Sequence, residues 1–343
     1  MKYINLGNTG LKVSEVCLGT WQLPRSKEKD QYGIRRVDIE ETRNVVALAF
    51  DNGVNFIDTA NRYSGAMITS DLHHVGNVEK ILGEILREYH RESYVIATKV
   101  GIQMGPWVNG DGLSRKHIFW QIGESLKRLQ LEYVDVYLAH SPDEETPHLE
   151  TLHAFDDLVH LGKAHYLGSS NFLEEQVMDF MELSQEHGLT GFATLQEPYS
   201  LVDRAIEQSK IPIARKYNLS IMAYSPLAQG ILSGKYLSGI PEGSRATYSQ
   251  NLRRAISERS LVGLGELSRL AEEKGISLSQ LAIAWVLRKQ KALGVNVIPI
   301  IGVSSSEQLL ENLQAVEVQL SEDEIASAEQ IAATVKVHDI LRG

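Results

Sequence analysis

Cysteine, long apolar runs and an excess of positive charge are all missing from this sequence. The only cysteine, Cys17, has no partner for a disulfide or a paired-cysteine metal pattern, so we expect it to be a small core residue. No apolar stretch approaches the roughly 18 residues that a membrane-spanning helix needs. The formal charge of −10 disfavours nucleic-acid and anionic-membrane partners, because both bind basic surfaces. Small-molecule chemistry is the favoured class of function.

Linkers, low-complexity tracts and long charge runs are also absent, so nothing in the sequence marks a boundary between domains. The start of the chain lacks the apolar core of a signal peptide. With 43% hydrophobic and 23% charged residues, the composition is that of an ordinary globular chain with a sizeable core. We therefore expect a single domain over residues 1–343, located in the cytoplasm.

Segments rich in Val, Ile, Tyr and Phe alternate with stretches that have helical spacing. The predicted strands are 16–19, 54–57, 94–98, 134–139, 164–168, 192–196, 220–224 and 296–301. The predicted helices are 38–52, 79–89, 114–130, 149–161, 174–187 and 279–289, with Ser114 and Ser279 as N-caps and Gly53, Gly162 and Gly188 after last turns. This alternation implies a doubly wound sheet or a closed barrel, and eight units favour a (β/α)8 TIM barrel.

Three further segments lie outside the repeated units. The opening segment, 2–13, is predicted to form a β-hairpin that caps the bottom of the barrel. The long interval between the last two strands holds a Gly-rich, basic segment from Gly230 to Arg245 and an extra helical stretch at 261–273. Loops after the seventh and eighth strands of such barrels commonly hold phosphate, so this insertion is a candidate cofactor clasp. Residues 316–343 are predicted to form a mostly helical tail.

Four polar residues stand where strand-like runs end, namely Asp58, Tyr63, Lys99 and His140. A barrel gathers the C-terminal ends of its strands on one rim, where these residues could converge. A tyrosine donates a proton near neutral pH when a nearby ammonium stabilises its phenolate, and Asp58 could hold Lys99 in place for that task. His140 could orient or polarise a carbonyl oxygen. Each residue alone has a structural explanation, but the set favours proton chemistry.

Several motifs in order along the chain resemble those of the aldo-keto reductase superfamily. The matching segments are 18–21, 56–60 with Tyr63, 98–99, 167–172 and 224–227. Further segments, 112–118, 233–236 and 244–246, resemble the branch that includes the β-subunits of voltage-gated potassium channels. The resemblance implies a (β/α)8 barrel, an NADPH cofactor extended across the rim, and reduction of an aldehyde or ketone to an alcohol. It also implies that Tyr63 is the general acid, that Lys99 and Asp58 adjust its pKa, and that His140 orients the carbonyl.

The resemblance also implies a set of cofactor contacts. Ser170, Asn171 and Gln196 match positions that hold the nicotinamide carboxamide, Tyr224 matches the stacking aromatic, and Ser225, Pro226, Leu227, Ala228 and Gln229 form the loop beside the pyrophosphate. Lys235 and Arg245 match the site of the 2′-phosphate. The adenosine end is matched by Gly302, Ser304, Gln308, Glu311 and Asn312. Further cofactor contacts are expected from Thr20, Trp21 and Asp58. NADPH is favoured over NADH because a 2′-phosphate needs positive charge or several donors. Val303 and Gln308 depart from a common lysine and arginine of the family.

The substrate pocket is expected to include Trp21, Tyr63, Trp107 and His140. The loop 64–76 is longer than in relatives and could line or cover this pocket. No basic cluster dedicated to a substrate phosphate is visible in the sequence. The pair His73-His74 is not expected to bind a metal, because adjacent histidines point apart and no further ligand spacing supports it.

Two other functions use the same residues. One is an NADPH-binding redox sensor or regulatory subunit with slow turnover, against which the retained His140 weighs. The other is a sugar or alcohol dehydrogenase that runs in the reverse direction. A homo-oligomer is possible, with 230–260 and 64–76 as the segments to examine for subunit contacts.

Overall fold

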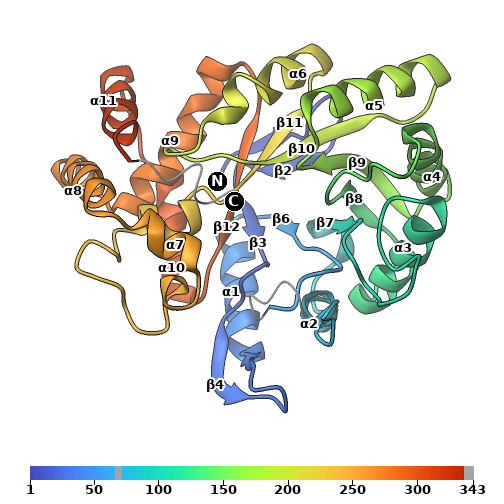
Figure 1. Ribbon diagram of the computed structural model, residues 1–343, viewed down its shortest axis with the longest axis horizontal. Coiled ribbons are helices and arrows are strands. Elements are labelled where there is room, and N and C mark those ends of the chain that lie inside the picture. Colours follow the sequence, from blue (N-terminus) through green and yellow to red (C-terminus); the bar gives the residue numbers. More distant parts are fainter. Residues whose placement is uncertain (66–71, 336–343) are drawn as a thin grey trace.

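The computed structural model describes residues 1–65 and 72–335, and its centre is a closed barrel of eight parallel strands surrounded by helices (Figure 1). The barrel strands are β3 (Cys17–Gly19), β6 (Phe56–Asp58), β7 (Val95–Val100), β8 (Val134–Ala139), β9 (Ala164–Ser170), β10 (Phe192–Pro198), β11 (Ser220–Tyr224) and β12 (Val297–Gly302). Each pairs with the next, and β12 closes the barrel against β3 through Ile301 and Leu18. The predicted TIM barrel and all eight predicted strands are confirmed.

The helices follow the strands in alternation. They are α1 (Ile39–Asp51), α2 (Asn77–Leu86), α3 (Arg115–Leu129), α4 (His148–His160), α5 (Glu174–His187), α6 (Lys210–Tyr217), α7 (Gln250–Ala255), α8 (Glu258–Glu273), α9 (Leu278–Leu293), α10 (Ser306–Leu313) and α11 (Glu322–Ala332). Ser114 caps α3 as predicted, because its side chain accepts a hydrogen bond from the backbone of His117. The cap predicted at Ser279 was wrong. Ser277 begins α9 instead, because it forms a reciprocal capping box with Gln280.

The three glycines predicted to follow helix ends adopt left-handed backbone conformations. Gly188 ends α5 with a φ of 65°, and Gly53 and Gly162 follow α1 and α4 with φ of 81° and 66°. All three adopt the left-handed conformation that glycine reaches without steric cost. Among the described residues, no helix is long and apolar enough to cross a membrane.

Apolar side chains fill the barrel interior, and the predicted N-terminal hairpin closes its lower end. Phe56, Leu138 and Met222 are fully buried there, together with Cys17. The hairpin pairs β1 (Tyr3–Asn5) with β2 (Lys12–Ser14) and adds Leu6 and Val13 to this cluster. The Gly7 N–H donates to Ser220 Oγ at the start of β11, over 2.6 Å. The bottom of the barrel is therefore packed and does not form a pore.

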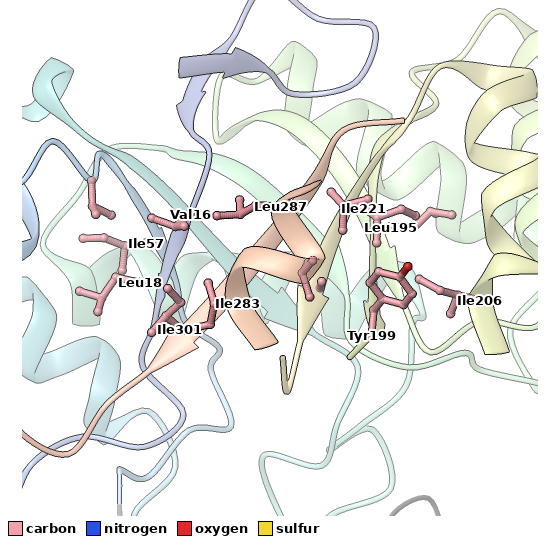
Figure 2. Close-up of a cluster of buried hydrophobic side chains, with 14 of the residues drawn as sticks. Val16, Leu18, Ile57, Leu195, Tyr199, Ile206, Ile221, Ile283, Leu287 and Ile301 are labelled. Carbon is pink, nitrogen blue, oxygen red and sulfur yellow. The ribbon is translucent and has the colours of Figure 1, made fainter. Parts of the chain in front are cut away.

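A second apolar layer lies between the barrel and its helices. Ile283 and Leu287 of α9 lie close to Ile301 of β12 and to Val16, which directly precedes β3 (Figure 2). Full burial of each such side chain contributes about 1.5–3 kcal/mol to folding. Trp285 of α9 is fully buried, and its indole N–H donates to Glu329 of α11 over 3.1 Å. The C-terminal tail is helical through α11 as predicted, while residues 336–343 lie outside the described residues.

A second hairpin was not predicted from the sequence. It pairs β4 (Arg25–Lys29) with β5 (Arg35–Val37) between the first barrel strand and α1, and β4 lies beside α1 at the edge of the molecule (Figure 1). Its turn is held by Asp30, whose Oδ1 accepts from the N–H groups of Tyr32 and Ile34 over 2.9 and 3.0 Å. Gly33 takes the left-handed turn position with a φ of 77°.

Candidate active site

The four residues at the predicted strand ends converge on one rim. Asp58 is the last residue of β6 and pairs with Ala97 of β7, while Lys99 pairs with Leu138 of β8. His140 follows β8 directly, and its N–H donates to the carbonyl of Val100 over 2.7 Å. Tyr63 comes from the loop after β6. Parallel pairing with this register therefore brings residues from three strands and one loop together.

Lys99 is the centre of the group. Its Nζ lies 2.8 Å and 2.9 Å from the two carboxylate oxygens of Asp58, and the ammonium is completely buried. It also lies 2.8 Å from the carbonyl oxygen of Thr59 and 3.0 Å from Tyr63 Oη. Three partners match the three protons of an ammonium, which offsets part of the cost of burying the charge. The Thr59 carbonyl was not predicted; its position directly after Asp58 was the available signal.

The environment sets the protonation of these groups. Burial raises the pKa of Tyr63, although the ammonium of Lys99 acts in the opposite direction. Burial lowers the pKa of Lys99, but Asp58 and Tyr63 together outweigh this effect, so the net pKa is raised. Burial and the nearby Lys99 lower the pKa of His140 well below its ordinary value. At neutral pH the site therefore holds a protonated phenol, an ammonium and a neutral imidazole.

His140 stands next to Tyr63 with its ring edge-on. The ring centroids are 5.9 Å apart at an interplanar angle of 76°. The imidazole Nδ1 is buried, and within residues 1–65 and 72–335 it has no hydrogen-bond partner. The backbone carbonyl of His140 accepts from Asn171 Nδ2 over 2.9 Å. A neutral imidazole beside a phenol can hydrogen bond to a carbonyl oxygen placed between them.

The residues predicted to hold a nicotinamide carboxamide are joined to this group. Gln196 Nε2 donates to Asp58 Oδ1 over 2.7 Å, which directs its amide N–H toward the carboxylate. The Tyr224 hydroxyl donates to Asn171 Oδ1 over 2.9 Å, and Asn171 Nδ2 donates to Ser170 Oγ over 3.0 Å. These contacts orient two amide and two hydroxyl groups beside the catalytic candidates.

Backbone strain is concentrated in the same region. Outside two helix ends, the non-glycine residues with positive φ among those described are Asn171, Ser225, Ala228 and Gln229, with φ between 48° and 64°. Each costs of order 1–3 kcal/mol, and such residues cluster at functional sites. Pro226 and Leu227 lie inside the turn closed by the Ala228 N–H on the Ser225 carbonyl, over 2.8 Å. All four strained positions are ones predicted to contact the cofactor.

A cavity of about 550 Å³ opens between the loops that follow β9, β10 and β11. Its walls include Asn171, Tyr224, Ser225 and Gln229 from the predicted cofactor segments. The buried side chains of Glu197, Asp203 and Lys210 add charge to its lining. The cavity is therefore lined by the strained loop and not by the four catalytic candidates, which are absent from its walls.

The two predicted phosphate ligands are the half-buried Arg245 and the exposed Lys235. The Arg245 guanidinium, in η4 (Arg245–Thr247), lies 4.6 Å above the Trp21 ring, and Lys235 follows η3 (Ala228–Ser233). Burial lowers the pKa of both, and the positive charge of Arg245 further lowers the pKa of Lys235. Neither has an acidic partner in the part of the chain that the structure describes. Such a pair fits an anionic group.

The remaining predicted cofactor contacts line the edge between β3 and β12. Ser304 follows β12, whose last residue is Gly302, and its N–H and Oγ contact Gln308 Oε1 over 3.0 and 2.9 Å. Gln308, Glu311 and Asn312 lie on α10, and the Ser306 N–H at its start donates to Glu41 of α1 over 2.7 Å. Thr20 is buried, and its hydroxyl donates to the carbonyl of Asp58 over 2.8 Å.

Two predicted features have a different setting. Trp107 is 56% exposed and packs against Trp120 of α3, with ring centroids 5.6 Å apart, so its place in the substrate pocket stays a prediction. In the loop 64–76, residues 66–71 lie outside the described residues. His73 stacks on Tyr32 and His74 contacts Asp30. The described residues hold no group of three or more metal-ligating side chains.

Comparison with known proteins agrees with this geometry. The model of the aldo/keto reductase family matches residues 15–333. A Schizosaccharomyces pombe protein named for a voltage-gated potassium channel subunit beta is 36% identical over 91% of this chain and 87% of its own length. L-glyceraldehyde 3-phosphate reductase of Escherichia coli O157:H7 is 34% identical over 96% of this chain and 92% of its own length. The chain therefore belongs to the aldo/keto reductase family, oxidoreductases that use nicotinamide cofactors in carbonyl reduction.

Proposed function

We propose that this chain is a single-domain, NADPH-dependent reductase of aldehydes or ketones in which Tyr63 donates the proton. The observation that carries the proposal is the buried chain of contacts from Asp58 through Lys99 to the Tyr63 hydroxyl. The same rim holds a neutral imidazole and a set of strained backbone positions suited to an extended ligand.

Each residue has a role that follows from its contacts. Bound NADPH supplies the hydride. Tyr63, whose raised pKa keeps it protonated, gives its proton to the substrate oxygen, and the phenolate that remains lies 3.0 Å from the Lys99 ammonium. That charge is in place before the reaction, so it stabilises the developing phenolate without reorganisation. Asp58 holds Lys99, and neutral His140 orients the carbonyl by a hydrogen bond.

The proposed preference for NADPH over NADH rests on positive charge. Lys235 and Arg245 are cations without acidic partners among the described residues, and the adenosine 2′-phosphate carries the matching charge. Gln196, Asn171 and Ser170 would hold the carboxamide, and Tyr224 the nicotinamide ring. Ser304 and Gln308 would contact the adenosine end.

A regulatory subunit is the second candidate, favoured by the likeness to the protein named for a channel subunit. That function needs cofactor binding but little turnover. The rings of Tyr63 and His140 lie side by side, with centroids 5.9 Å apart, which supports catalysis as the first choice. The same residues could also run an alcohol oxidation in reverse.

The test is steady-state oxidation of NADPH and NADH with neutral and phosphorylated aldehydes. Replacement Tyr63→Phe should lower turnover by at least about 100-fold, since a positioned general acid contributes 10²–10⁴-fold. The dissociation constant for NADPH, measured by fluorescence quenching, should stay within about twofold. Lys235→Gln with Arg245→Gln is the matched control: it should raise KM for NADPH and leave KM for NADH unchanged. Retained turnover in Tyr63→Phe would remove this residue from its role.

A further inference from the structure

The β4–β5 hairpin carries positive charge that is out of keeping with the rest of the molecule. Residues 25–37 contain five cations, Arg25, Lys27, Lys29, Arg35 and Arg36, and two acids, Glu28 and Asp30, which makes +5 − 2 = +3. Because the whole chain carries −10, the remaining residues carry −10 − 3 = −13. The β4–β5 hairpin is therefore a basic surface on an acidic molecule.

None of the five cations is neutralised within the part of the chain that the structure describes, where no hydrogen bond or ion pair involves their side chains. Asp30 does not compensate them. Its carboxylate accepts two backbone N–H groups of the turn and contacts His74 Nε2 at 2.5 Å, so its charge is already engaged. Glu28 is the single acid left to face the five cations.

The positive charge lowers the stability of the hairpin. Lys29 and Arg35 are direct cross-strand partners, and like charges directly opposite destabilise an antiparallel pair. A local conflict of this kind, at an exposed position where other residues would do, is typical of a functional surface. An anion held near the hairpin would relieve the repulsion.

The hairpin lies against the loop that carries Tyr63. A side chain at Gly65, two residues after Tyr63, would come within 2.7 Å of Val37 Cγ2 at the end of β5. Farther out, the Tyr32 ring stacks on His73 with centroids 4.6 Å apart, and Asp30 contacts His74. The hairpin also begins four residues after Trp21, whose ring lies under Arg245. The hairpin is therefore anchored to the loop that follows Tyr63.

We propose that the β4–β5 hairpin attracts carbonyl substrates that carry a phosphate or carboxylate group, and so sets a preference for anionic substrates. This inference rests on the proposed reductase function. The sequence alone showed no basic cluster dedicated to a substrate phosphate, and the proposal assigns that role to the hairpin.

Elementary electrostatics gives the size of the effect. If a phosphate dianion passes about 10 Å from the hairpin, its three net charges favour that substrate about threefold at 0.15 M salt and about twentyfold at 0.01 M salt. For a carboxylate the factors are about twofold and about fivefold, because the charge is half as large. A neutral substrate gains nothing.

The experiment compares kcat/KM for matched substrates in two variants of equal charge. Lys27→Gln/Lys29→Gln/Arg35→Gln removes the net charge of the hairpin. The control, Lys2→Gln/Lys12→Gln/Lys163→Gln, removes three exposed lysines near the opposite end of the barrel. The substrate pairs are 4-carboxybenzaldehyde with benzaldehyde, and a phosphorylated hydroxyaldehyde with its unphosphorylated form, each at 0.01 M and 0.15 M salt. Binding of 4-carboxybenzaldehyde by calorimetry, with oxidised cofactor present, gives the same comparison without turnover.

The hairpin variant should lose the factors above for the charged member of each pair, keep its activity on the neutral member, and lose most of its salt dependence. The control should behave as the unmodified protein. An unchanged ratio of charged to neutral substrate would overturn the inference, and so would an equal loss in the control or a loss confined to KM for NADPH. If no aldehyde is turned over but anion binding still depends on the hairpin, the reductase function fails while this inference stands.

Discussion

Replacement of Lys99 by methionine separates the structural and chemical roles of the buried charges. The Lys99 side chain is 0% exposed and the Asp58 side chain 4%, and the change removes the two contacts of 2.8 and 2.9 Å that neutralise the carboxylate. Breaking one partner of a buried pair costs about 3–5 kcal/mol. Gln196 Nε2 still donates to Asp58 over 2.7 Å, so we expect a loss near the lower end, about 3 kcal/mol.

The double variant Asp58→Asn/Lys99→Met tests the cause of that loss. It removes both charges together. Replacing a buried ion pair by uncharged side chains changes the free energy of unfolding little, so most of the stability lost in Lys99→Met should be regained. Turnover should not return, because the Tyr63 phenolate would then form without the ammonium that lies 3.0 Å away.

Urea denaturation and NADPH oxidation are measured on the same four proteins: unmodified, each single variant and the double variant. A loss below about 1 kcal/mol in Lys99→Met would refute the account of the buried pair, since an unpaired buried charge cannot be so cheap. Recovery of turnover in the double variant would refute the assigned role of Lys99 in proton donation.

Two further predictions concern stability. The pKa of His140 is lowered in the folded protein, so on acidification the unfolded chain binds a proton at this residue first. The free energy of unfolding should therefore fall as the pH drops below about 6.5, by up to about 1.4 kcal/mol per pH unit. His140→Asn should flatten this slope in urea titrations at pH 7.5, 6.5 and 5.5, and parallel curves would contradict the assignment. Gly7→Ala should cost more than about 2 kcal/mol, because Gly7 has a φ of 57° and its new Cβ would meet the Ala193 carbonyl oxygen at 2.1 Å. Gly10→Ala, which has nothing within 4 Å, should change stability by less than about 0.5 kcal/mol and serves as the control.

The predictions that held depend on local patterns. The barrel strands and most helices follow from the period of apolar residues, which burial on one face or both imposes on each segment separately. The convergence of Asp58, Lys99 and His140 follows from one topological rule, that parallel strands end on the same rim. The hairpin at 25–37 was not predicted because its strands are charged and exposed, so no buried face imposes a period of apolar residues on them.

The sequence by itself determined the barrel, the rim and the residue types on it, because periodicity and strand order are properties of neighbouring residues. Only the tertiary structure decided the protonation of the site. The ammonium of Lys99 lowers the pKa of Tyr63, but burial has the larger effect, so the net pKa is raised. Likewise, Gln196 reaches Asp58 across 138 positions of sequence. Desolvation and such long-range contacts depend on every element packed around the site, and no local pattern records them.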